Sequence, residues 1–229
     1  MDIVAGRLLG TMVIYGFPEQ ELEPELDIAL GIGASLLEIL PDWSRFPDPE
    51  LVRKQSADRG LSIHSAHGCW GGRTIRASRV DLGSADPSVR RESVDDLKEC
   101  VDWLNRAGGS CLVVHPGGLS IPSDFLSRRA ALAQGLIALA EHATGAGVTI
   151  CVENMPPGVH PGSRMADLAD LLIELNHPRL ALALDTGHAN LTANAAEETR
   201  ACRPTAVTTL RRPLRDPALR RVPPAGRRL

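Results

Sequence analysis

Aromatic residues and long apolar stretches are both scarce in this 229-residue sequence. Because only 3% of the residues are aromatic while 43% are hydrophobic, the core must consist of Leu, Val, Ile and Ala, which favour helices packed on buried parallel strands. No run of about 18 apolar residues occurs, so we expect no segment that spans a membrane. The N-terminal segment MDIVAGRLLG also lacks the basic and then apolar pattern of a signal peptide.

Cysteines with metal-binding spacing and glycine-rich phosphate loops are absent as well. The five cysteines are an odd number without metal-ligand spacing, and we expect a reduced, cytoplasmic protein. No GxGxxG or Walker-type loop follows any of the expected strands, which argues against a nucleotide-binding, doubly wound sheet.

Basic side chains are scarce in most of the chain and concentrated at its end. The net charge is −3, but residues 203–229 hold eight arginines and one acid. Residues 1–202 therefore hold 17 basic and 27 acidic side chains, a net charge of −10. Such an acidic body argues against nucleic acid as a partner.

Apolar runs alternate with helical patterns, as in a parallel sheet built from βαβ units. Asp48-Pro49 and Asp86-Pro87 predict two helix starts, because aspartate caps free amides and proline tolerates the first helical position. Further helices are expected from Ser123 and from Ser163. The expected strands cover residues 11–15, 35–40, 61–65, 110–115, 148–153 and 180–185.

The number of units decides the expected fold. Six units occupy about 190 residues, whereas an eightfold barrel typically takes about 250 residues. We therefore predict an α/β fold, a (β/α)8 TIM-type barrel that is incomplete after about six βα units. The barrel domain is expected over residues 1–200 and an irregular Arg/Pro-rich tail over residues 201–229.

Ionisable residues stand at the ends of four expected strands. Because parallel strands place their C-terminal ends on one face, we expect these side chains to converge there. Two neighbouring carboxylates repel each other unless a cation lies between them, and imidazoles with carboxylates suit a divalent ion such as Zn²⁺, Mn²⁺ or Co²⁺. The candidate metal ligands are His64, His115, Glu153, Asp185 and His188.

Four other residues are candidates for substrate binding. His67 follows the third expected strand, close to the ligand candidates. Glu38 lies in an apolar strand, where it either faces the barrel mouth or pairs with an arginine. Trp70 either stacks on a sugar ring or packs against the barrel rim. Asn154 either donates to a substrate hydroxyl or satisfies loop backbone groups.

The order of these motifs resembles the xylose isomerase-like TIM barrel superfamily, which includes sugar-phosphate isomerases and epimerases and the endonuclease IV group. The resemblance covers roughly residues 8–200. Its segments are Ile63-His64-Ser65, Val114-His115-Pro116-Gly117, Val152-Glu153-Asn154 and Leu184-Asp185-Thr186-Gly187-His188.

The resemblance implies residue roles as well as a fold. In the isomerase–epimerase branch Glu153 and Asp185 are expected to bind the metal, and Glu153 also to serve in proton transfer. His64, His115 and His188 match ligand positions of the multi-zinc nuclease branch. The implied cofactor is Mn²⁺, Zn²⁺, Co²⁺ or Mg²⁺, and the implied reaction passes a proton through an enediolate.

Three functions are open at this point. The first is a divalent-metal-dependent isomerase or epimerase of a sugar or sugar phosphate, inactive if the C-terminal strands are missing. The second is a metal-dependent abasic-site endonuclease. The third is a non-catalytic remnant that binds a ligand or partner, for which open sheet edges would allow a homo-oligomer.

The tail departs from the family pattern. No histidine follows His188 and no glutamate follows Glu198, so the ligands expected on a seventh and an eighth strand are missing. Residues 205–210 form a candidate seventh strand without a ligand. Two explanations are open for the tail: a shift of reading frame near residue 203, or a genuine basic arm for an acidic partner or nucleic acid.

Overall fold

The computed structural model describes residues 9–192 and 195–202, and these form a single parallel sheet covered by helices. The sheet has the order β1-β2-β3-β4-β5-β6, so every strand pairs with its neighbours in sequence. A doubly wound sheet would instead reverse its order at a switch point. The barrel-type arrangement is thus confirmed for six βα units. The strands are β1 (Gly10–Tyr15), β2 (Leu36–Pro41), β3 (Ser62–His67), β4 (Cys111–Val114), β5 (Thr149–Glu153) and β6 (Leu180–Ala183).

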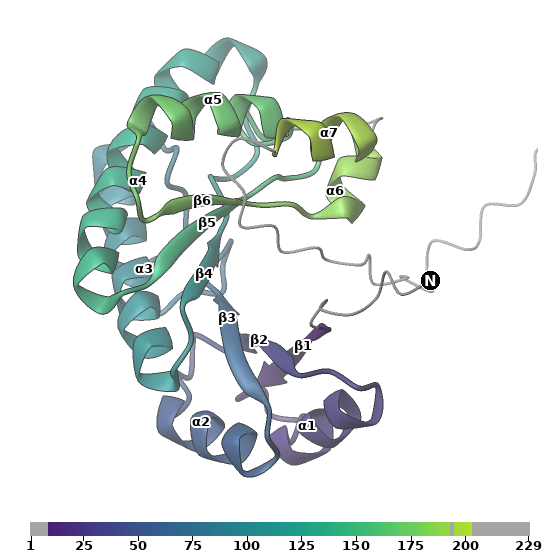
Figure 1. Ribbon diagram of the computed structural model, residues 1–229. Coiled ribbons are helices and arrows are strands. Elements are labelled where there is room, and N and C mark those ends of the chain that lie inside the picture. The colour runs from purple at the N-terminus through teal and green to yellow at the C-terminus, as the bar shows by residue number, and fades with distance from the viewer. Residues whose placement is uncertain (1–8, 193–194, 203–229) are drawn as a thin grey trace, which may run out of the picture.

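The main helices line the convex side of this curved sheet (Figure 1). They are α1 (Leu22–Gly31), α2 (Pro49–Asp58), α3 (Pro87–Ala107), α4 (Phe125–Ala146) and α5 (Met165–Leu175), followed by the short α6 (Thr186–Leu191) and α7 (Ala195–Ala201). The side chain of Asp48 accepts a hydrogen bond from the first turn of α2, and Asp86 does the same for α3. Both predicted caps are therefore confirmed. Helices α4 and α5 each begin two residues later than Ser123 and Ser163 had indicated.

Two apolar layers hold the described fold together. The large outer layer lies between sheet and helices and includes the fully buried Trp43 and Trp103. The small inner layer consists of Cys111, Val113, Cys151, Ala181 and Ala183. Because successive strand residues point to opposite faces, the strands supply bulky residues outward and small ones inward.

Some of the expectations from the sequence concern residues that the structure does not describe. None of the described helices combines the length and the apolarity that crossing a membrane requires. The tail and its candidate strand at residues 205–210 lie outside the described residues. The domain boundary near residue 200 therefore stays a prediction.

Candidate metal centre

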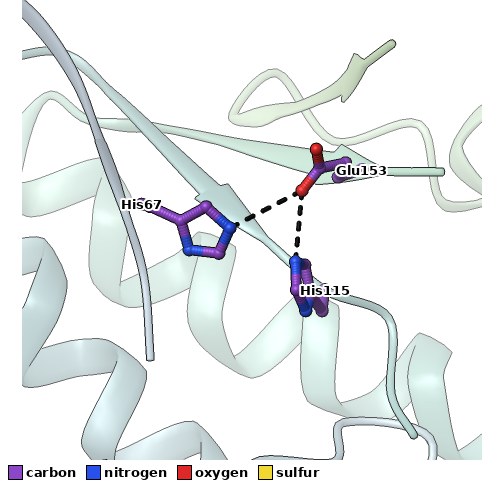
Figure 2. A group of neighbouring side chains, drawn as sticks. All are labelled: His67, His115 and Glu153. Carbon is purple, nitrogen blue, oxygen red and sulfur yellow. Dashed lines mark ion pairs between the residues drawn. The ribbon is translucent and has the colours of Figure 1, made fainter. Parts of the chain in front are cut away.

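Glu153 is the last residue of β5 and lies at the centre of a cluster of ionisable side chains. Its side chain is only 1% exposed. Its Oε2 atom lies 3.2 Å from Nε2 of His115 and 3.7 Å from Nε2 of His67. Figure 2 shows the two imidazoles converging on this carboxylate from the ends of neighbouring strands. Since β3, β4 and β5 are parallel neighbours, their C-terminal ends bring these three side chains together.

The hydrogen bonding of His67 determines what its ring presents to Glu153. Nδ1 of His67 lies 2.8 Å from the carbonyl oxygen of Gly68. A carbonyl oxygen only accepts, so Nδ1 carries the proton and Nε2 of the neutral ring keeps its lone pair. That lone pair faces a carboxylate oxygen, another acceptor. A cation between the two atoms, either a proton or a metal ion, removes this conflict.

A second group of ligand atoms adjoins Glu153 on the side of β6. Ligand atoms of Glu153, Asp185 and His188 lie within 4.8 Å of one another, as do those of His67, His115 and Glu153. Nδ1 of His188 lies 2.8 Å from the carbonyl oxygen of Asn154. By the same reasoning Nε2 of His188 is available to a ligand. Glu153 thus belongs to both groups.

The donor set fits a divalent metal ion. Ligand atoms that share one ion at bond lengths of about 2.1 Å lie about 3.0–3.4 Å apart. The 3.2 Å between His115 and Glu153 falls in this range, and the 3.7 Å between His67 and Glu153 is slightly longer. Imidazole nitrogens fixed by hydrogen bonds through their other ring nitrogen are typical of metal ligands. The mixture of nitrogen and carboxylate donors suits Zn²⁺, Mn²⁺ or Co²⁺.

Asn154 positions Asp185, a member of the second group, through hydrogen bonds to its backbone. Asn154 is fully buried. Its amide Nδ2 donates to the carbonyl oxygen of Asp185 at 3.0 Å, and its Oδ1 accepts from the Asp185 amide at 2.7 Å. Asp185 in turn caps α6 by accepting from the backbone amide of His188. Both side-chain atoms of Asn154 are thus engaged with the backbone of Asp185, while its predicted contact with substrate stays a prediction.

His64 and Glu38 lie elsewhere on the sheet. A register shift between Leu37 and Glu38 pairs the latter with Ser65, so the ladder skips His64. A hydrogen bond with Cys111 raises the pKa of His64. Glu38 is buried, and its charge acts on His64. The structure therefore places His64 beside Cys111, the first residue of β4, with the charge of Glu38 close enough to raise the pKa of His64.

Cys111 and Cys151 both belong to the small inner apolar layer. A hydrogen bond with Cys151, and a further one with His64, lower the pKa of the Cys111 thiol to about 4. The hydrogen bond with Cys111, together with burial, raises the pKa of Cys151 well above its usual value. Cys111, Cys151 and His64 thus form one hydrogen-bonded cluster at the start of β4.

A buried ion pair ties together the loops around the centre. Nη2 of Arg128 lies 2.8 Å from Oδ1 of Asp81, and both side chains are largely buried. Nε of Arg128 also donates to the carbonyl oxygen of His160 at 3.2 Å. Helix α4 is thereby linked to the loop after β3 and the loop after β5. Sequence reasoning missed this pair, because its members lie 47 residues apart and neither stands at a strand end.

Comparison with known proteins shows the family and the fold. The model of the xylose isomerase-like TIM barrel family matches residues 26–211. A "Probable endonuclease 4" of Thermoplasma acidophilum is 29% identical over 151 residues, which cover 64% of this chain and 48% of the relative. Another, of Solibacter usitatus, is 27% identical over 193 residues, which cover 76% and 61%. The chain thus spans about half of the first relative and three fifths of the second.

Several solved structures with the same fold are named as sugar epimerases. The 3-keto-D-glucoside 4-epimerase of E. coli superposes with a TM-score of 0.72 at 18% identity, covering 88% of this chain and 76% of that one. A D-psicose 3-epimerase crystallised in the presence of D-fructose gives 0.70 at 19% identity, covering 95% and 76%. The D-allulose 3-epimerase of Methylomonas sp., in complex with D-allulose, gives 0.69 at 23% identity, covering 82% and 64%.

Proposed function

Because this chain belongs to the xylose isomerase-like TIM barrel family, we propose that it is a divalent-metal-dependent isomerase or epimerase of a sugar or sugar phosphate. The single observation that carries the metal is the convergence of His67, His115 and Glu153, whose ligand atoms lie within 4.8 Å of one another. The sugar is supported by the solved neighbours, whose names describe them as epimerases of small sugars.

We assign the residues of the centre to two roles, metal binding and proton transfer. His67, His115 and Glu153 would hold one divalent ion, with Asp185 and His188 completing the site on the side of β6. A bound divalent ion supplies Lewis acidity, which acidifies the C–H bond next to a sugar carbonyl. Glu153 removes this proton and returns it, as a positioned carboxylate does in general acid–base catalysis.

Metal content and isomerisation are measured on the same preparation. We expect metal bound after dialysis against Zn²⁺ or Mn²⁺, and conversion of ketose to aldose or to the epimeric ketose that is lost in EDTA. Glu153→Gln and His67→Gln should each lower metal affinity by at least about 100-fold. His142→Gln is the matched control, since His142 pairs with Asp102 on the helical surface. A protein without bound metal and inactive on every sugar tested would refute the proposal and favour a non-catalytic role.

A second candidate function is cleavage of DNA at abasic sites. Two observations favour it: Glu153 belongs to two groups that together contain three histidines, and two relatives bear the name endonuclease 4. The net charge of −10 over residues 1–202 opposes binding to the phosphate backbone. Cleavage of an abasic duplex with more than one metal ion per chain, and no isomerisation, would replace the first proposal by the second.

A further inference from the structure

A cavity of about 570 Å³ opens beside the metal centre, on the side of β1 and β2. Its floor includes Ile14 of β1 and Leu40 of β2, both near the C-terminal ends of their strands. Phe17 from the loop after β1 and Trp70 and Arg73 from the loop after β3 supply two aromatic rings and a cation. The cavity therefore lies on the face of the sheet where the candidate metal ligands lie.

A tight turn fixes Trp70 and Arg73 as a pair. The amide of Arg73 donates to the carbonyl oxygen of Trp70 at 2.8 Å, and the amide of Trp70 donates back at 3.3 Å. Gly71 and Gly72 form the tip between them, and Gly71 has a φ of 52°, which glycine adopts without strain. Residues directly opposite each other in an antiparallel pair direct their side chains to the same side. Trp70 and Arg73 thus face the cavity together.

The guanidinium of Arg73 contacts two aromatic rings. Its central carbon lies 5.1 Å from the centroid of the Phe17 ring and 5.9 Å from that of Trp70. Within the part of the chain that the structure describes, this guanidinium forms no ion pair with a carboxylate. Aromatic rings attract a cation through their π faces, and the N–H groups of the guanidinium can still make a planar, bidentate contact with an anion.

Trp70 connects this cavity to the metal centre. Its ring meets the ring of His67 edge-on, with 4.8 Å between the centroids. His67 in turn faces Glu153. The indole of Trp70 therefore lies between Arg73 and His67, a candidate metal ligand. A substrate that is bound at the metal centre and extends past Trp70 enters the cavity.

We propose that Arg73 binds the phosphate of a phosphorylated sugar whose reacting carbons lie at the metal centre. The inference rests on the proposed function for the sugar part of the ligand, whereas the phosphate contact stands on the cavity alone. Phe17 and Trp70 cover the apolar face of the sugar, as aromatic rings do. Glu19 and Gln20, which also line the cavity, accept and donate hydrogen bonds with its hydroxyl groups.

Calorimetry on the metal-free protein tests the phosphate contact separately from catalysis. D-fructose 6-phosphate and D-fructose form the matched probes, with EDTA present throughout. We expect the phosphorylated sugar to bind at least about 10-fold more tightly, as a charge-assisted bidentate contact implies. Arg73→Gln should abolish the difference and Arg73→Lys should keep part of it. Arg91→Gln, an exposed arginine of α3, should leave it unchanged.

The outcomes separate this inference from the proposed function. Equal binding of the two probes by the wild type, absence of binding, or an unchanged preference in Arg73→Gln would each overturn the phosphate contact. Isomerisation of the phosphorylated sugar that Arg73→Gln leaves unchanged would overturn it too, while supporting the proposed function. A preference that depends on Arg73, in a protein without isomerase activity, would support the phosphate contact and count against the proposed function.

Discussion

Replacing Asn154 by alanine separates metal binding from the stability of the fold. The side-chain amide of Asn154 holds the backbone of Asp185 through two hydrogen bonds of 3.0 and 2.7 Å. The backbone carbonyl oxygen of Asn154, which accepts from His188, survives the substitution. The variant therefore removes the hydrogen bonds that position one candidate ligand, Asp185, without removing any ligand atom.

The size of the effect follows from these two bonds. A buried polar group that loses its partner costs about 1–3 kcal/mol, and because both bonds are only part-buried we expect a loss of about 2–3 kcal/mol of unfolding free energy. For a chain of this size that corresponds to a fall in Tm of about 4–12 °C. Removing a hydrogen-bond partner of a metal ligand typically lowers the metal affinity about 10–100-fold. We expect Asn154→Ala to lower the Zn²⁺ affinity by this factor.

The assay combines urea unfolding with Zn²⁺ titration, and a second variant serves as the control. Leu136→Ala in α4 removes a fully buried side chain and should cost about 2–5 kcal/mol while leaving the centre intact. Asn154→Ala should therefore lose metal affinity and Leu136→Ala should not. Wild-type affinity in Asn154→Ala, or an equal loss in Leu136→Ala, would refute the positioning role.

Two further predictions concern the surroundings of the site. Tyr15 is the only tyrosine, and burial followed by the charge of Asp48 raises its pKa, so tyrosinate absorbance in the folded protein should have a midpoint above 10. Because the folded pKa lies above the unfolded one, the stabilisation is complete below about pH 10 and is lost as the pH rises through the folded pKa; Tyr15→Phe should remove this dependence, and a folded midpoint at or below 10 would contradict the burial of the hydroxyl. Gly117→Ala would drive a methyl group into the Asp81 carboxylate and should cost about 1–3 kcal/mol in urea unfolding. Gly118→Ala meets that carboxylate only at 3.8 Å, and equal losses in both variants would disprove the clash.

The strand–helix alternation and the convergence of strand ends were both predictable from local patterns. Aspartate before proline marked the starts of α2 and α3, because capping depends on residues a few positions apart. The position of each apolar run then placed His115 and Glu153 at strand ends. The family resemblance made the barrel order the expected one, and the sheet confirms it for the described strands.

Only the tertiary structure decided which polar residues meet. The third strand was expected to end at residue 65, but it continues to His67 because two further residues pair with β4. The register shift opposite Glu38 leaves His64 out of the ladder, and neither change has a local signal, since pairing depends on a neighbouring strand. The same holds for the contact of Arg73 with Phe17 across 56 positions of sequence. Local chemistry thus determined the elements and the kinds of side chain at their ends, whereas strand register and loop packing determined which of them share a site.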